Sequence, residues 1–198
     1  HCVVGTSMGA VVGGLYASGY SAAEIADIFV YTDWAEVLGG RPPREDQSYL
    51  QSERSADYLT GALIGLGDDG IRLPGGIRSM RGLRRHFRQL TFHVPLDADF
   101  DALAVPYRAV VTDFATGDPV ALSSGDLVQA MLASMAVPGA FQPREIDGAL
   151  YVDGGMAAQL PVQMAQAMGA DIIIAIDTTV EPPAPSSSPS MADTMQQL

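Results

Sequence analysis

The sequence contains no lysine, so arginine supplies all 11 of its basic residues, against 23 acidic ones. The resulting net charge of −12 argues against a nucleic-acid partner, because the phosphate backbone would be repelled. A glycine-rich loop after a strand can hold a nucleotide phosphate, but the Walker loop requires a lysine. The glycine-rich turn near the start of this chain is therefore not a Walker loop, and the dinucleotide-binding glycine pattern is absent there too.

Disulfide and metal chemistry have few residues to work with. The single cysteine, Cys2, cannot form an internal disulfide, and we expect it to be a small buried strand residue. The three histidines and this cysteine show no metal-ligand spacing. We therefore expect no metal.

Long apolar runs are also missing, so the sequence predicts no membrane-spanning helix, and no signal peptide is visible. Its length of 198 residues suits one globular domain, which we place at residues 1–180. Residues 181–198 are predicted to be a Pro/Ser-rich linker and the start of a following segment. Because His1 falls within a predicted strand, we expect an N-terminal piece, with any targeting signal, to precede it.

The most informative motif is Gly5-Thr6-Ser7-Met8-Gly9, which has the pattern G-x-S-x-G. It follows the apolar run 2–4 and precedes the small-residue run 10–17, so it predicts a strand, a sharp turn and a helix. In that context the serine is the nucleophile of an elbow, and the backbone N–H of Met8 can stabilise an oxyanion. Gly5 and Gly9 are explained by neighbouring backbone that must pass very close.

The remaining pattern predicts an α/β fold, a three-layer sandwich with a mostly parallel central sheet covered on both faces. Helices are expected after the elbow, from the capping box Ser21–Glu24, and over 79–90, 126–135 and 161–169. Strands are expected over 58–66, 70–73, 105–111, 120–122, 150–152 and 171–177. Residues 39–55 are interpreted as a surface excursion.

The helix predicted over 79–90 combines an apolar stripe with a basic one. Six of the eleven arginines lie between Arg72 and Arg88, which is a local concentration of positive charge in an acidic protein. The basic stripe consists of Arg81, Arg84, Arg85 and Arg88. It is either a solvated helix face or a surface that contacts phosphate headgroups, which arginine binds in a bidentate manner.

A serine nucleophile needs a base, and no histidine follows His93. His86 is expected at the surface and His93 at a loop edge. Asp153 is the better candidate, because it ends a predicted strand and precedes Gly154 and Gly155, where open α/β sheets place ligand sites. Asp-Gly-Gly could also be a simple turn, but together with the elbow it suggests a Ser7–Asp153 dyad.

Four blocks of the sequence occur in the order found in a known family. They are Gly5-Thr6-Ser7-Met8-Gly9-Ala10, Thr112-Asp113-Phe114-Ala115-Thr116-Gly117, Ala133-Ser134-Met135-Ala136-Val137-Pro138-Gly139-Ala140-Phe141-Gln142-Pro143 and Asp153-Gly154-Gly155. With these blocks the chain resembles the patatin-like phospholipases. The resemblance implies hydrolysis of fatty-acyl esters, chiefly of phospholipids, by a Ser7–Asp153 dyad without metal or cofactor. It also implies a glycine-rich oxyanion segment upstream of His1, so Met8 is the only donor to be named here.

We therefore expect a serine esterase of the phospholipase A type. The alternatives are an acyltransferase or thioesterase with the same dyad, and a lipid-binding domain with little catalysis. Candidate acyl-pocket residues are apolar side chains expected near the elbow, although ordinary core is favoured for any single one of them. They are Val11, Leu132, Met135 and Phe141.

Location and partners follow from the resemblance and the linker. The Pro/Ser-rich stretch 181–189 resembles the connection of a passenger domain to the barrel of an outer-membrane autotransporter. We expect a bacterial protein that is secreted or associated with the outer membrane, with the cytoplasm as the alternative. The expected partners are a phospholipid or other fatty-acyl ester, a transient membrane surface and a second copy of the chain in a homodimer.

Overall fold

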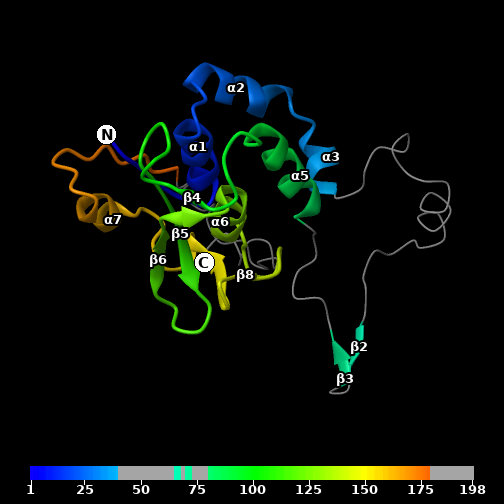
Figure 1. The fold of residues 1–198 in the computed structure, drawn as a ribbon. Coiled ribbons are helices and arrows are strands. Elements are labelled where there is room, and N and C mark those ends of the chain that lie inside the picture. Colours follow the sequence, from blue (N-terminus) through cyan, green and yellow to red (C-terminus); the bar gives the residue numbers. More distant parts are fainter. Residues whose placement is uncertain (40–64, 68–69, 73–79, 179–198) are drawn as a thin grey trace, which may run out of the picture.

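The computed structural model describes residues 1–39, 65–67, 70–72 and 80–178. A five-stranded sheet forms the centre, and most of the helices lie together on one side of it (Figure 1). Its strands are β1 (Val3–Thr6), β5 (Tyr107–Asp113), β6 (Pro119–Leu122), β8 (Arg144–Ile146) and β9 (Ala149–Asp153). The helices are α1 (Met8–Ala17), α2 (Ala22–Tyr31), α3 (Trp34–Gly39), α5 (Arg81–Leu90), α6 (Leu127–Ser134), α7 (Val162–Ala167) and the 3₁₀ turn η2 (Gly154–Met156).

The sheet has the order β1-β5-β9-β8, with β6 also paired to β5. Only β1 and β5 run parallel, whereas β5–β6, β5–β9 and β8–β9 are antiparallel. The expectation of a mostly parallel sheet was therefore wrong. The sheet is mixed because short turns connect β5 to β6 and β8 to β9, and a short turn can join only antiparallel strands. One such turn is Asp147-Gly148, whose φ values of 51° and 82° suit a two-residue hairpin turn.

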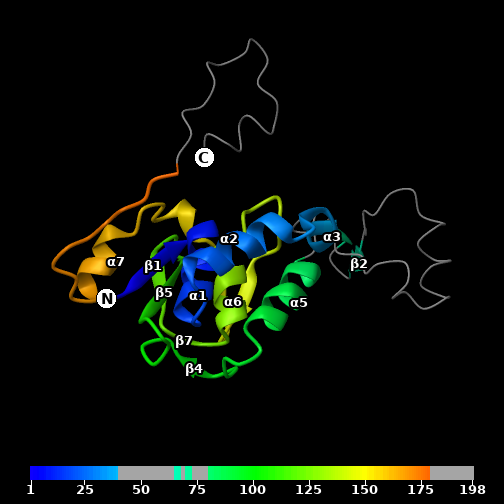
Figure 2. The ribbon, with the colours of Figure 1, turned by 90° about the horizontal axis from the view of Figure 1, so that it is seen from above.

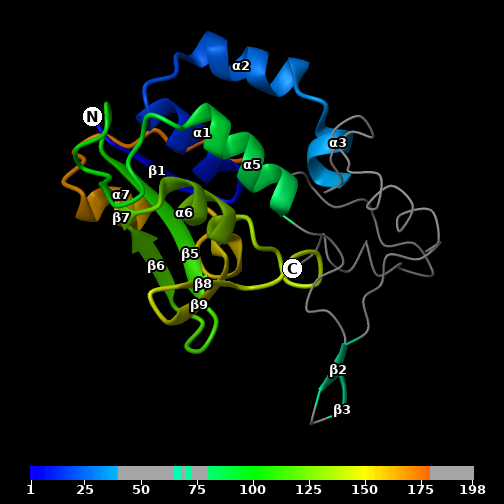
Figure 3. The same cartoon turned by 45° about the vertical axis from the view of Figure 1, so that its right-hand side comes forward.

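Three helices lie side by side in the order α1, α6, α5, so that α6 occupies the middle (Figure 2). Both α1 and α6 pack against β5, and α2 crosses outside α1 (Figure 3). The core lies between these helices and the sheet, and its largest fully buried side chains include Tyr107, Phe87 and Leu15. The third layer of the predicted sandwich stays a prediction.

Local signals in the sequence predicted several elements well. Ser21 and Glu24 form the expected capping box of α2, and Asp126 caps α6 by accepting hydrogen bonds from the N–H groups of Val128 and Gln129. A hairpin of β2 (Gly65–Gly67) and β3 (Gly70–Arg72) occupies part of the two strands predicted around it. The short strands β4 (Ala98–Asp99) and β7 (Ser124–Gly125), together with α3, were not predicted.

The predicted buried strand 171–177 was wrong. These residues form no strand, and Ile172, Ile174 and Ile176 are 86%, 86% and 78% exposed. An apolar run becomes a buried strand only where a neighbouring strand supplies its hydrogen bonds, and none pairs with it in the described ranges. Cys2 is also not fully buried and lies just before β1. The predicted linker 181–198, the strand residues 58–64 and most of the excursion 39–55 lie outside the described residues.

Candidate active site

The turn between β1 and α1 holds Ser7 in a backbone conformation that few non-glycine residues adopt. Its φ and ψ are 53° and −119°, and α1 begins at the next residue. A Cβ at Gly5 would lie 2.2 Å from the carbonyl oxygen of Gly9, so the close approach predicted for Gly5 is confirmed. A Cβ at Gly9 would meet no atom of the described residues within 4 Å, so the same explanation was wrong for Gly9.

The Ser7 hydroxyl donates a hydrogen bond to Oδ2 of Asp153, with 2.7 Å between the two oxygens. Asp153 is the last residue of β9 and only 5% exposed. Its other carboxylate oxygen accepts a hydrogen bond from the Gly155 N–H at 2.7 Å. Burial raises the pKa of Asp153, and the hydrogen bonds from Ser7 and Gly155 partly oppose this shift. The fold thus brings together the two residues that the sequence pointed to.

The backbone around Asp153 is fixed by hydrogen bonds on both sides. The Thr112 hydroxyl donates to the Asp153 carbonyl oxygen at 2.9 Å, and the Asp153 N–H donates to the carbonyl oxygen of Ala136 at 3.1 Å. A Cβ on Gly154 would lie 2.2 Å from the carbonyl oxygen of Val110. Gly154 is therefore needed because β5 passes directly beneath the turn.

Ser134, the last residue of α6, is a supporting residue whose role sequence reasoning missed. Its buried hydroxyl accepts a hydrogen bond from the Ser7 N–H at 2.8 Å and donates one to the carbonyl oxygen of Val110 at 2.5 Å. This bridge ties the strained elbow to β5. Ser134 and Thr112 both lie in blocks that carry the family resemblance, but a block does not reveal which hydroxyl bonds to which backbone group.

The start of α1 provides the environment for a developing negative charge. The N–H of Met8 is the first of the helix, and first-turn N–H groups have no partner within their own helix. The helix dipole adds a partial positive charge at the same place. The role of Met8 as an oxyanion donor next to Ser7 stays a prediction.

None of the three histidines hydrogen-bonds to Ser7 or Asp153 within the described ranges. His86 is half-buried rather than at the surface, because it packs edge-on against Trp34 and lies 3.3 Å from the Thr32 hydroxyl. Burial lowers the pKa of His86. His93 bonds through its ring to the carbonyl oxygen of Ser18 at 2.8 Å, and His1 is exposed at the chain start.

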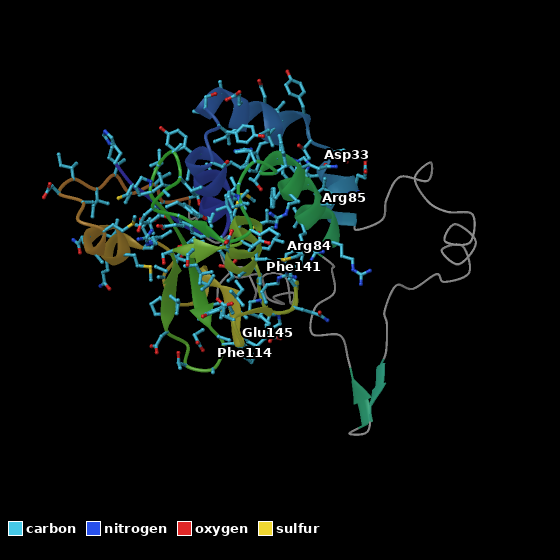
Figure 4. All side chains as sticks on the ribbon, viewed as in Figure 1. Asp33, Arg84, Arg85, Phe114, Phe141 and Glu145 are labelled. Carbon is cyan, nitrogen blue, oxygen red and sulfur yellow. The ribbon has the colours of Figure 1, made fainter. Side chains whose placement is uncertain are left out.

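The candidate acyl-pocket residues fall into two groups. Val11 and Leu132 are completely buried members of the core, so a pocket-lining role for them was wrong. Met135 and Phe141 are partly buried and pack against the core. A cavity of about 320 Å³ lies between α3 and α5, and Asp33 and Arg85 are among its lining residues (Figure 4). It does not include the dyad.

The arginines of α5 have different surroundings. Arg88 forms an ion pair with Asp126, and Arg85 lies 4.0 Å from Glu36 of α3. Arg81 and Arg84 are exposed, and Arg84 is seen in Figure 4 on the side where α5, α6 and β8 meet. The predicted basic stripe is thus not a uniform solvated face.

The described residues contain neither a metal-binding cluster nor a membrane-spanning helix. No group of three or more His, Cys, Asp or Glu side chains among them could hold a metal ion. No helix in the same ranges has both the length and the apolar character needed to cross a bilayer.

Comparison with known proteins gives the family. The model of a protein family described as patatin-like phospholipase matches residues 1–165 of the chain. An uncharacterized NTE family protein of Mycobacterium tuberculosis is 32% identical over 174 residues, which is 88% of this chain and 39% of that protein. The human patatin-like phospholipase domain-containing protein 6 is 28% identical over 88% of this chain and 11% of its own length. The chain thus spans well under half of these relatives. It belongs to the patatin-like phospholipase family.

Proposed function

We propose that this chain hydrolyses fatty-acyl ester bonds of phospholipids, with Ser7 as nucleophile and Asp153 as proton acceptor. The observation that carries the proposal is the 2.7 Å hydrogen bond from the Ser7 hydroxyl to the Asp153 carboxylate. The strained turn and the helix that follows it are the setting in which a serine acts as a nucleophile. Membership of the patatin-like phospholipase family supports the substrate class.

In the first half-reaction the Ser7 oxygen attacks the ester carbonyl carbon while its proton passes to Asp153. The carbonyl oxygen becomes an oxyanion, which the Met8 N–H and the α1 dipole stabilise. Collapse of this tetrahedral intermediate breaks the bond to the alcohol oxygen. Asp153 returns the proton to that oxygen, so the lysophospholipid leaves neutral at this position and the acyl group stays on Ser7.

In the second half-reaction water takes the place of the alcohol. Asp153 accepts a proton from the water, whose oxygen attacks the acyl-enzyme carbonyl carbon. The second tetrahedral intermediate breaks its bond to the Ser7 oxygen, which recovers a proton from Asp153. The products are a fatty acid and free enzyme. The raised pKa of Asp153 makes its carboxylate a stronger base than an exposed one.

A fluorophosphonate probe on the full-length protein tests the nucleophile. We expect labelling of the wild type and none of Ser7→Ala, whose hydrolysis of a diacyl phospholipid should fall by on the order of 10⁴-fold or more. Ser123→Ala is the matched control, because Ser123 is exposed. An unlabelled wild type, or Ser7→Ala labelled as strongly as the wild type, would overturn the proposal.

Two other functions fit the same fold and are separated by product analysis. An acyltransferase forms a new ester when an acceptor alcohol is added, whereas a hydrolase releases free fatty acid in either case. A thioesterase releases fatty acid faster from an acyl thioester than from the matching oxygen ester. A lipid-binding domain binds vesicles equally well as wild type and as Ser7→Ala, with no product from either.

The cellular setting is a separate proposal. We infer that this is a bacterial protein that is secreted or attached to the outer membrane, with the cytoplasm as the alternative location. The support is the Pro/Ser-rich sequence 181–189, which resembles the linker that follows an autotransporter passenger domain. A homodimer belongs to the same proposal. Cell fractionation and light scattering of the full-length protein test these points, and a monomer found wholly in the cytoplasm would overturn both.

A further inference from the structure

Two arginines of α5 and one of β8 lie near Asp126 and Gln129 at the N-terminal end of α6. Arg88 reaches Asp126 from α5 and forms an ion pair with it. Arg144, the first residue of β8, donates a hydrogen bond to the side-chain oxygen of Gln129. Arg84 lies one helical turn before Arg88 and close enough to Arg144 to affect its ionisation.

We call Arg84, Arg88 and Arg144 the arginine cluster, and both carboxylate oxygens of the neighbouring Asp126 already accept hydrogen bonds. One oxygen of Asp126 accepts hydrogen bonds from the N–H groups of Val128 and Gln129, and the other accepts from Arg88. Neither Arg84 nor Arg144 forms an ion pair with a carboxylate in the described ranges. Among the described residues, the cluster therefore has two arginines without an ion pair of their own, and the Asp126 charge that acts on Arg144 is shared with Arg88.

Arg144 is the more constrained of the two arginines. It is half-buried and is held by a neutral amide. Burial lowers the pKa of Arg144, and the neighbouring Arg84 lowers it further, while Asp126 acts in the opposite direction. Glu145 follows directly, but alternation along β8 directs it to the other face of the sheet, and it is exposed. A half-buried guanidinium beside a second one is a site that an anion would stabilise.

The arginine cluster and the dyad lie on the same face of the sheet. Arg144 pairs with Tyr151 across the β8–β9 hairpin, and Asp153 is two residues further along β9, so their side chains share a face. Helix α6 links them as well, since Gln129 contacts Arg144 and Ser134 bonds to the Ser7 N–H. Five residues separate Gln129 from Ser134, which is about 8 Å along a helix axis.

We propose that Arg84 and Arg144 bind the phosphate group of a phospholipid substrate while its ester lies at Ser7. The phosphate of a phospholipid is only a few bonds from its ester groups, which suits two sites at opposite ends of one short helix. Two planar guanidiniums from α5 and β8 can hold phosphate oxygens from two sides. This deepens the proposed function and rests on it, and it assigns a role to Arg144 that the basic stripe of α5 did not include.

Matched substrates test the proposal in the full-length protein. One is a short-chain diacyl phosphatidylcholine, and the other is a p-nitrophenyl ester of the same fatty acid, which has no phosphate. For Arg84→Gln/Arg144→Gln we expect kcat/KM on the phospholipid to fall at least about 10-fold more than kcat/KM on the p-nitrophenyl ester, mainly through KM. Arg85→Gln is the control, because it removes the same charge from α5 next to Glu36 and should change this ratio less than about twofold.

A binding measurement separates the lipid phosphate from free phosphate and does not depend on turnover. In the Ser7→Ala background, calorimetry compares glycerophosphocholine with inorganic phosphate, each with and without the two Arg→Gln changes. Binding of glycerophosphocholine that is lost in the double variant supports the proposal. Binding of inorganic phosphate alone, or an equal loss of rate on both esters, would overturn it. A wild type that cleaves neither ester would instead refute the proposed function, whatever the calorimetry shows.

Discussion

The two ends of α6 are built by different interactions, although eight residues span the whole helix. At the C-terminal end, the buried Ser134 hydroxyl holds the Ser7 N–H, and Ala136 just beyond holds the Asp153 N–H. All of these bonds use uncharged groups. At the N-terminal end, the contacts are charged and half-exposed, with Arg88 and Asp126 side chains 34% and 22% accessible.

The C-terminal end of α6 therefore depends on fixed positions of its groups, whereas the N-terminal end depends on charge. Buried hydrogen bonds fix positions, because leaving one partner unsatisfied costs its full desolvation free energy. Half-exposed charges tolerate movement, because water and salt can replace a lost partner. The C-terminal end of α6 therefore suits covalent chemistry at Ser7, and the N-terminal end suits reversible contact with an anion.

The largest expected effect comes from removing the charge of the dyad. Asp153→Asn should lower kcat by on the order of 10⁴-fold, because Ser7 loses its proton acceptor. The same change should raise the free energy of unfolding at pH 7. Burial raises the pKa of Asp153 above its ordinary 3.8, so the wild-type folded state is penalised for holding the carboxylate at neutral pH.

The sign of this stability effect is checked by its pH dependence. Below pH 3.8 the carboxyl is protonated in both folded and unfolded wild type, so the advantage of Asp153→Asn should vanish there. Urea unfolding across pH measures it, and Asp118→Asn at an exposed aspartate is the control. The acid limb of the wild-type kcat/KM profile should also lie above pH 3.8. An Asp153→Asn protein less stable than wild type at pH 7 would contradict this account.

The next effect distinguishes the two glycines of the elbow motif. Gly5→Ala places a Cβ 2.2 Å from the Gly9 carbonyl oxygen, so it should cost about 3 kcal/mol or more in the free energy of unfolding. In Gly9→Ala the added methyl group points away from all described atoms, and alanine favours a helix more than glycine does. The free energy of unfolding should therefore rise by between zero and about 1 kcal/mol. Urea denaturation and soluble yield report both, and equal stability of the two variants would refute this distinction.

Features that depend on a few consecutive residues could be predicted from the sequence, whereas features that depend on contacts between distant residues could not. Local rules were sufficient for the elbow around Ser7 and for the capping box of α2, because both depend on a few consecutive residues. Asp153 was found because a strand end followed by two glycines is also a local pattern. The β8–β9 hairpin at Asp147-Gly148 was local too. The strand predicted over 150–152 lies within β9, but the three residues of β8 are too few to show a clear alternation, so β8 was missed.

Other features depend on contacts between distant residues. The bridge from Ser134 to Ser7 spans 127 positions, and nothing in a single sequence shows that these groups meet. The meeting of Arg84 and Arg144 has the same origin. Residues 171–177 show the converse: their apolar run predicts a strand, but a strand also needs a partner strand, which a single sequence does not show.

The smallest expected effect lies at the N-terminal end of α6. Arg88→Gln removes one partner of a half-exposed ion pair, while Asp126 keeps its capping hydrogen bonds to α6. We expect a loss of about 0.5 kcal/mol in the free energy of unfolding at low salt, decreasing as salt is added. Thermal and urea unfolding at several ionic strengths measure this change.

Ser134→Ala is the matched variant for the other end of the helix. It leaves the Ser7 N–H and the Val110 carbonyl without their shared partner in a buried position, so it should cost about 1 to 3 kcal/mol. Because no charge is involved, that cost should not depend on salt, and kcat should fall as the elbow loosens. If Arg88→Gln cost as much as Ser134→Ala and equally at all ionic strengths, Arg88 would be a fixed structural support. The N-terminal end of α6 would then be as geometrically constrained as the end that holds Ser7.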